Sequence, residues 1–402
     1  MITPLGVGLE ASWTGLLAGR SGIAAAHQLR GTRYAGRAAG EIPQFDPAIW
    51  IAPKRRRTMG RYSQLAVAAA HLAWRDAGIE ISDGEALRAG CVLGVAAGGL
   101  PEIEAYKEAL LDGRAKSVAY PLLPRMLPNQ ASGQVATALG LRGPVSCVST
   151  ACASGNNAIG TALHWIRCGD ADLVVTGSTE ACLSEICLAD LDRMGVLSPE
   201  TIRLDTACRP FDRARGGLVP AEGAGILVLE EEGRARRRGA HVYCELLGYG
   251  SSADAFHPVA PRRDGSGIAT CIERALCDAH AIPERVAYVN AHGTGTVVGD
   301  EAETIGLKRA FGTHARRVAV SSTKSMLGHQ LGGCGGVEAA IVALVVERGQ
   351  IPPTINYETP DPVCDLDYVP NTARSVRVDL ALSSAFGFGG TNAAIVVGRY
   401  AG

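Results

Sequence analysis

The strongest constraint on the fold is an alternation of short apolar runs with helix-like stretches along the chain. The apolar runs have the length of strands and lie at 89–95, 173–177, 224–229, 286–291, 318–322, 380–385 and 392–397. Apolar residues recur at helical spacing in 10–18, 62–77, 155–167, 267–280, 300–311 and 335–348. Strands that are apolar on both faces belong to sheets covered by helices on both sides.

The second half of the chain repeats the strand and helix order of the first. No low-complexity linker separates the halves, and no exact-period repeat is visible. We therefore expect an α/β body built from two duplicated halves, residues 1–240 and 241–402.

Composition excludes several classes of protein. The net charge of −1 argues against a nucleic-acid binder. The longest apolar run, residues 337–346, is too short to span a bilayer. The 12 cysteines include no CxxC pair, so we expect no metal site. The chain opens without a signal-peptide pattern, and we expect reduced thiols in the cytoplasm.

Cys152 lies between the end of a strand-like run and the start of a predicted helix, in Cys147-Val-Ser-Thr-Ala-Cys152-Ala-Ser-Gly-Asn-Asn157. Unpaired N–H groups and the positive end of a helix dipole favour a thiolate at such a position. This predicts that Cys152 is a nucleophile. The alternative is an unreactive core residue, because free cysteine is among the most buried residue types.

Two histidines also follow predicted strands. His292 lies in Asn290-Ala-His-Gly-Thr-Gly-Thr296 and His329 in Thr323-Lys-Ser-Met-Leu-Gly-His329. Ligands of open α/β sheets bind at the carboxyl ends of strands, so we expect a Cys-His-His site there. No carboxylate lies next to either histidine motif, which favours neutral imidazole donors. A thiol that accepts acyl groups and two donors that stabilise an enolate suit acyl transfer followed by carbon–carbon bond formation.

Five stretches of the chain resemble the β-ketoacyl-acyl-carrier-protein synthases of the thiolase superfamily, most closely the synthase II type. They are Ser149-Thr-Ala-Cys-Ala-Ser-Gly155, Arg209-Pro-Phe-Asp212 with Glu222-Gly-Ala-Gly225, Asn290-Ala-His-Gly-Thr-Gly-Thr296, Ser322-Thr-Lys-Ser-Met-Leu-Gly-His329 and Ala385-Phe-Gly-Phe-Gly-Gly-Thr-Asn392. The resemblance covers nearly the whole chain and implies a five-layered αβαβα thiolase-like fold and a homodimer.

The resemblance also implies a reaction. Cys152 would take an acyl chain from an acyl-carrier protein, and a malonyl-carrier protein would then lose carbon dioxide and attack the thioester. His292 and His329 would stabilise the enolate, and the N–H groups of Cys152 and Phe388 would form an oxyanion hole. Further residues match by position: Lys324 as active-site lysine, Glu338 as its partner, Phe386 and Phe388 in the gating loop, and Thr294 and Thr296 on the pantetheine arm. No cofactor is implied beyond the carrier's phosphopantetheine.

The chain departs from the family pattern at four places. It opens at Met1-Ile-Thr-Pro-Leu-Gly6, where the family has a strand of about ten residues first, so we expect either a late start or an incomplete sheet edge. Leu218 and Ala221 replace a Phe and a Gly in the turn at 215–222. Val259 replaces a pantetheine-contacting Thr. Ala97 stands where a bulky aliphatic residue is frequent, and we expect it to widen the acyl pocket.

The sequence allows more than one interpretation of the carrier-protein docking surface and of the biosynthetic pathway. The basic run Lys54, Arg55, Arg56 and Arg57 lies where the family docks its acidic carrier protein, although such a run can also be an ordinary solvated surface. The enzyme could act in fatty-acid or in polyketide synthesis. A silent partner subunit of a heterodimer is the alternative, disfavoured because Cys152, His292 and His329 are all present. A thiolase is disfavoured because 386–390 contains no cysteine.

Overall fold

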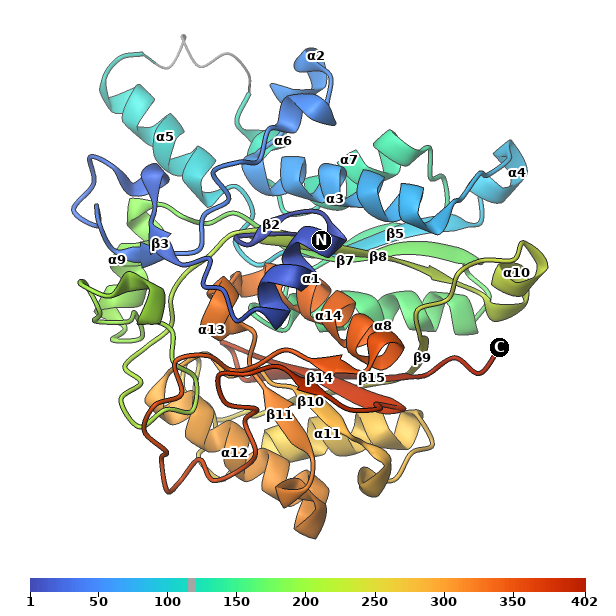
Figure 1. The fold of residues 1–402 in the computed structure, drawn as a ribbon. Coiled ribbons are helices and arrows are strands. Elements are labelled where there is room, and N and C mark those ends of the chain that lie inside the picture. Colours follow the sequence, from blue (N-terminus) through green and yellow to red (C-terminus); the bar gives the residue numbers. More distant parts are fainter. Residues whose placement is uncertain (115–120) are drawn as a thin grey trace.

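Two mixed β-sheets alternate with three layers of helices in this protein (Figure 1). The computed structural model describes residues 1–114 and 121–402. The six-stranded sheet has the order β2-β1-β8-β7-β5-β6 and the five-stranded sheet the order β11-β10-β14-β15-β9. The expected α/β fold of five layers is therefore confirmed.

The first sheet takes its strands from the first half of the chain and the second sheet from the rest. The first comprises β1 (Ile2–Thr3), β2 (Gly6–Val7), β5 (Ala89–Gly94), β6 (Val145–Val148), β7 (Leu173–Glu180) and β8 (Gly223–Glu230). The second comprises β9 (Glu245–Ala253), β10 (Tyr288–Asn290), β11 (Ala319–Ser321), β14 (Leu380–Gly387) and β15 (Thr391–Gly398). Strand β5 pairs in parallel with β6 and β7, and β10 pairs in parallel with β11 and β14.

Helices cover both faces of each sheet (Figure 1). The outer layers contain α3 (Arg61–Ala77) and α7 (Gln130–Leu139) on one side, and α11 (Ser266–Asp278) and α12 (Val297–Phe311) on the other. The shared middle layer contains α8 (Ser154–Arg167) and α14 (Cys334–Arg348). Every residue of α14 from 334 to 346 is buried, as expected of a helix enclosed between sheets. Gly336 permits this enclosure, because a Cβ there would lie 2.1 Å from the Gly225 carbonyl oxygen.

Smaller elements surround these layers. They are α1 (Leu9–Leu17), α2 (Pro53–Arg56), α4 (Asp83–Ala86), α5 (Leu100–Leu111), α6 (Leu123–Met126), α9 (Glu185–Arg193), α10 (Glu232–Arg237), α13 (Lys324–Leu327) and the short strands β3 (Ala24–Ala25), β4 (Ala38–Ala39), β12 (Gln350–Ile351) and β13 (Arg374–Ser375). Within the described residues, no helix combines the length and apolar character needed to cross a membrane.

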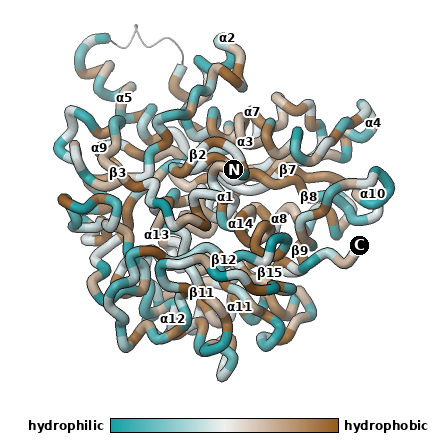
Figure 2. Tube along the Cα trace, in the orientation of Figure 1, coloured by the Kyte–Doolittle hydropathy of each residue, from teal (hydrophilic) through white to brown (hydrophobic). Residues whose placement is uncertain are grey.

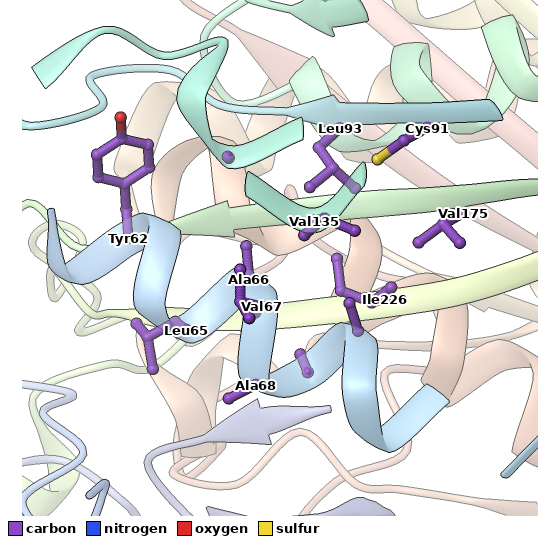
Figure 3. Packing of buried hydrophobic residues seen from close by; sticks show 14 of the residues in the cluster. Tyr62, Leu65, Ala66, Val67, Ala68, Cys91, Leu93, Val135, Val175 and Ile226 are labelled. Atoms are coloured by element: carbon purple, nitrogen blue, oxygen red, sulfur yellow. The ribbon is translucent and has the colours of Figure 1, made fainter. Parts of the chain in front are cut away.

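The largest core lies between α3, α7 and the first sheet. Figure 3 shows Val67 of α3 near Val135 of α7 and Ile226 of β8, with Leu93 of β5 above them and Tyr62 at the far end of the same cluster. Hydrophobic residues follow β7 through the interior, whereas the surface helix α10 is hydrophilic (Figure 2). At about 25 cal/mol per Å² of apolar surface removed from water, such burial is the main stabilising contribution to the fold.

The first sheet is only briefly paired between β8 and β1, the strand next to its terminal strand β2. Ile2 pairs with Ala224, and no strand of the described chain continues along the rest of β8 on that side. A groove of about 660 Å³ runs beside Leu227, Val228 and Leu229. Two residues of β1 therefore stand at the edge where the family pattern led us to expect a longer strand.

Candidate active site

The site is assembled where strands of both sheets end. Strands β10, β11 and β14 run parallel, so their carboxyl ends meet at one edge of the second sheet. His292 follows β10, Lys324 and His329 follow β11, and Phe386 lies at the end of β14. Strand β6 of the first sheet leads to Cys152, which precedes α8.

A tight turn presents Cys152. Ala151 before it has a φ of 50°, in the left-handed region that residues with a side chain rarely adopt. The turn lies against the end of β14, where a Cβ on Gly387 would be 2.7 Å from the Thr150 carbonyl oxygen and 3.0 Å from the Cys152 nitrogen. The close approach brings the backbone N–H of Phe388 within hydrogen-bond reach of the Cys152 sulfur.

Cys152 and the two histidines converge, as predicted from the sequence. His329 Nε2 lies 3.1 Å from Cys152 Sγ. The rings of His292 and His329 are perpendicular, with centroids 5.3 Å apart, and all three side chains offer a ligand atom within 4.8 Å of the others. All three are buried. His292 Nδ1 has no hydrogen-bond partner among the described residues.

The acidity of Cys152 differs from the expectation. Burial raises the pKa of its thiol to about 12, while the Lys324 charge and the N–H groups of Phe388 and Cys152 act in the opposite direction. Burial therefore acts against the helix terminus, and this direction is opposite to the lowered pKa that we expected at that position. The raised pKa favours the protonated thiol, and the His329 nitrogen at 3.1 Å is placed to accept its proton.

Both histidines are neutral. Burial and then the Lys324 charge hold the pKa of His292 and that of His329 well below the usual 6.5. Phe386 packs edge-on against His292 with ring centroids 5.6 Å apart. The carboxylate of Glu303 accepts hydrogen bonds from the backbone N–H groups of His292 and Gly293, at 2.7 and 2.6 Å. A carboxylate thus does lie beside this histidine motif, but it contacts the backbone.

Lys324 and Glu338 form a buried ion pair beside the histidines. Burial alone would lower the pKa of Lys324, but the Glu338 carboxylate reverses this and holds that pKa above its usual value. Glu338 comes from α14 and Lys324 from α13, so the pair ties the His329 segment to the middle layer. Lys324 binds Oε1 of Glu338, and the other carboxylate oxygen, Oε2, has no hydrogen-bond partner among the described residues.

This pair predicts a stability effect. Replacing Lys324 by methionine leaves the buried Glu338 carboxylate without its cation, and we expect the free energy of unfolding to fall by about 3–5 kcal/mol. Urea denaturation measures this fall. The double variant Lys324→Met with Glu338→Leu removes both charges and should recover most of the loss. A single variant within about 1 kcal/mol of the unchanged protein would contradict a charged pair.

Three buried partners of the site were not found from the sequence. Besides Glu303, Cys334 at the start of α14 places Sγ 3.0 Å from His329 Nδ1. Glu180, at the end of β7, accepts hydrogen bonds from the N–H groups of Ala96, Ala97 and Gly98. Glu303 lies within the predicted helix at 300–311 and Glu180 follows the predicted strand at 173–177, yet nothing in their spacing identifies the backbone groups they bind.

The altered turn near Leu218 contacts the His329 segment directly. The His329 N–H donates to the Val219 carbonyl at 2.7 Å, and the Ala221 N–H donates to the His329 carbonyl at 2.9 Å. Leu218 itself is buried among apolar residues that also contact Ala97. The departures from the family pattern therefore lie beside the site, although Cys152, His292 and His329 are retained.

The other predicted residues lie around this centre. Thr294 and Thr296 share a hydrogen bond at 3.0 Å next to His292. Phe388 is half-buried in the turn between β14 and β15. Ala97 is half-buried after β5. The basic run belongs to α2, on the outer side of the first sheet near α6 (Figure 1).

Five layers with a cysteine and two histidines at the junction of the sheets define a condensing enzyme of the thiolase fold. The chain belongs to the β-ketoacyl synthase family. Residues 1–235 match the family described as "Beta-ketoacyl synthase, N-terminal domain", and 243–358 match "Beta-ketoacyl synthase, C-terminal domain". The family, the fold class and the enzyme class expected from the sequence are thereby confirmed: it is an acyltransferase of fatty-acid or polyketide chain elongation.

Curated relatives and solved structures of this family each match nearly the whole chain. A 3-oxoacyl-[acyl-carrier-protein] synthase 2 of Synechocystis sp. is 42% identical over 399 residues, which cover 99% of this chain and 96% of the relative. The ishigamide ketosynthase/chain length factor has a TM-score of 0.92 at 37% identity, covering 99% of this chain and 97% of that one. A type II PKS ketosynthase in complex with its acyl-carrier protein (AntDE:AntF) has a TM-score of 0.86 at 33% identity, with the same coverage.

Proposed function

We propose that this enzyme condenses malonyl-acyl-carrier protein with an acyl chain held as a thioester on Cys152, with loss of carbon dioxide. The observation that carries the proposal is the 3.1 Å contact of Cys152 Sγ with His329 Nε2, with His292 converging on the same point. The proposed site needs no metal, since the buried Lys324 cation beside it already supplies positive charge.

In the first half-reaction, Cys152 attacks the thioester carbonyl of the acyl carrier. Its proton passes to His329 Nε2 and then to the leaving pantetheine sulfur. The tetrahedral oxyanion accepts hydrogen bonds from the N–H groups of Cys152 and Phe388, each of which is worth roughly 3 kcal/mol in such sites. The acyl group remains on Cys152.

In the second half-reaction, the malonyl thioester carbonyl accepts N–H bonds from His292 and His329. Loss of carbon dioxide gives an enolate at that oxygen, and its carbon attacks the acyl group on Cys152. The Cys152 sulfur leaves as a thiolate, which now carries the negative charge of the former malonyl carboxylate, and it takes up one proton from solvent. Neutral imidazoles suit this step, because they donate to the enolate without a net charge of their own.

The flanking residues have proposed roles in access and binding. The Thr294 and Thr296 hydroxyls face each other beside His292 and suit the amide groups of a pantetheine arm. Phe388 is followed by Gly389 and Gly390, with φ of 85° and 69°, which gives its turn the freedom to act as a gate once Cys152 is acylated.

Turnover by the isolated chain tests the proposal against its alternative, a silent subunit. We expect the purified protein alone to form 3-oxoacyl-carrier protein and carbon dioxide in equal amounts. Activity that appears only after a second, different ketosynthase subunit is added, with Cys152 dispensable, would favour the silent subunit. The ishigamide ketosynthase/chain length factor keeps this possibility relevant, because its name joins two such components.

We propose a dimer that forms through the β6 edge of the first sheet. Strand β6 is the terminal strand, and its Val145 is 45% exposed. An exposed edge strand offers unpaired N–H and C=O groups to a second copy. The edge lies next to Cys152 in sequence, so the partner would help to enclose the acyl chain.

A cytoplasmic location is proposed from the cysteine residues. All 12 cysteines lie in the described residues and are free thiols, which suits a reducing compartment.

The acyl chain is proposed to extend past Ala97. Its neighbours Leu183, Leu197 and Leu218 form an apolar cluster, and its N–H is held by Glu180. We expect Ala97→Ile to lower kcat/KM for long-chain acyl substrates by roughly tenfold or more, with short chains little affected. Competition between acyl-carrier proteins of different chain length measures this. An Ala97→Ile enzyme with unchanged long-chain preference would place the pocket elsewhere.

The acidic carrier protein is proposed to dock on the basic run of α2. Arg55 already binds the Gln134 carbonyl at 3.2 Å, whereas Lys54 and Arg57 are exposed. We expect Lys54→Glu with Arg57→Glu to lower kcat/KM for carrier-bound substrates about tenfold and to weaken its salt dependence.

Two controls isolate docking from folding. Reversing the exposed Arg236 and Arg237 on α10, away from α2 in Figure 1, should leave carrier-bound turnover unchanged. A pantetheine thioester that lacks the carrier should react equally with all variants. Unchanged turnover with carrier-bound substrate in the α2 variant would show that the carrier docks elsewhere.

A further inference from the structure

His329 is held between two thiols. Cys152 Sγ lies 3.1 Å from Nε2 and Cys334 Sγ lies 3.0 Å from Nδ1. Cys334 is fully buried at the first turn of α14. The N–H of Gln330 donates to the same Cys334 sulfur at 3.2 Å. The second thiol is therefore fixed in place by a backbone donor, and Nδ1 of His329 has it as a hydrogen-bond partner.

The two half-reactions make opposite demands on His329. In the first, Nε2 must be free to accept the Cys152 proton, so the ring proton must stand on Nδ1. In the second, Nε2 must carry a proton to donate to the enolate, so Nδ1 must be unprotonated. A neutral imidazole has one N–H, and its partner at the other nitrogen decides which tautomer is favoured.

A thiol suits both tautomers. Cys334 Sγ can accept from Nδ1–H, or its S–H can donate to bare Nδ1, while the Gln330 N–H occupies another position on the sulfur in either case. A partner that is only a donor or only an acceptor would favour one tautomer. Moving the ring proton from Nδ1 to Nε2 changes neither the atoms nor the net charge of the site.

We propose that Cys334 is a positioning residue that matches both tautomers of His329, and so supports acyl transfer and condensation in turn. This inference rests on the proposed roles of Cys152 and His329. Cys334 touches neither substrate nor the reacting sulfur in this role. It acts through the ring it holds.

The test compares Cys334→Ala with Cys334→Ser in the full-length protein. Alanine removes the hydrogen-bond partner, and we expect both half-reactions to slow about tenfold in single-turnover measurements, the equivalent of one hydrogen bond. Serine keeps a group that donates and accepts, and its rates should stay within about threefold of the unchanged enzyme. Cys271→Ala is the matched control, because this buried thiol binds the Gly250 carbonyl at 3.3 Å, outside the site.

A second readout separates positioning from packing. ¹⁵N chemical shifts of His329, identified with a His329→Gln sample, report which ring nitrogen carries the proton. We expect the shifts to change between free and acylated enzyme, and this change to be lost in Cys334→Ala but kept in Cys334→Ser. Unchanged rates and shifts in Cys334→Ala would overturn the proposal, as would a serine variant as slow as alanine. If the enzyme without substitutions fails to transfer an acyl group to Cys152, the proposed function itself is refuted.

Discussion

Replacing Cys152 by alanine is expected to lower the rate of 3-oxoacyl product formation by at least about 10³-fold. The sulfur is the atom that carries the acyl chain in the proposed reaction, so no other contact in the site can compensate for it. Initial rates with saturating acyl- and malonyl-carrier proteins measure the effect. The folded state should be retained, since the change removes only one small buried group.

Cys147→Ala provides the matched control for this variant. Cys147 is a half-buried thiol in β6, five positions before the nucleophile, and it packs against the core between α3 and the first sheet. We expect its removal to leave the rate within about threefold. Equal losses from the two variants would mean that the chemistry does not depend on the Cys152 sulfur.

Loss of His292 or His329 is expected to have the next largest effect. In the proposed reaction each donates one hydrogen bond to the enolate, and removal of such a donor costs about 10²–10³-fold in the condensation step. The two variants should differ in the first half-reaction. His329→Ala should also slow Cys152 acylation, because Nε2 is 3.1 Å from the sulfur, whereas His292→Ala should slow acylation much less.

Single-turnover experiments separate these two steps. His314→Ala is the control, since this histidine contacts the Val286 carbonyl away from the site. Because burial and the Lys324 charge hold the pKa of both active-site histidines well below 6.5, they stay neutral on mild acidification. Condensation should therefore show no loss with an apparent pKa near 6.5. A His292→Ala enzyme with normal condensation would remove this residue from the mechanism.

The layers and the meeting of Cys152, His292 and His329 could be predicted because both leave local signals. Continuous apolar runs gave strands such as β5, β7 and β8, and helical spacing gave α3, α8 and α14, with bounds close to those observed. Strand β9 at 245–253 mixes apolar residues with glycine and serine and carries no such signal; its pairing with β15 and its packing on α11 hold it in place. The residues that follow strand ends were found because sheet topology brings strand ends together.

The supporting contacts could not be predicted because they depend on distance in space. Cys334 lies near His329 in sequence, but only the 3₁₀ helix at Leu331–Gly333 before α14 brings its sulfur to the imidazole. Glu180 and Glu303 bind backbone N–H groups of loops that follow other strands. The raised pKa of Cys152 could not be predicted for a related reason: its position before a helix is visible in the sequence, whereas its complete burial is a property of the packed sheets.

The most direct test of the account is the mass of the enzyme after incubation with a panel of acyl-carrier proteins. The account predicts one added acyl group, located on the peptide that contains Cys152. Malonyl-carrier protein should then discharge it with release of carbon dioxide and formation of 3-oxoacyl-carrier protein. An acyl group on another residue, or product formation without any acyl group on Cys152, would contradict the account.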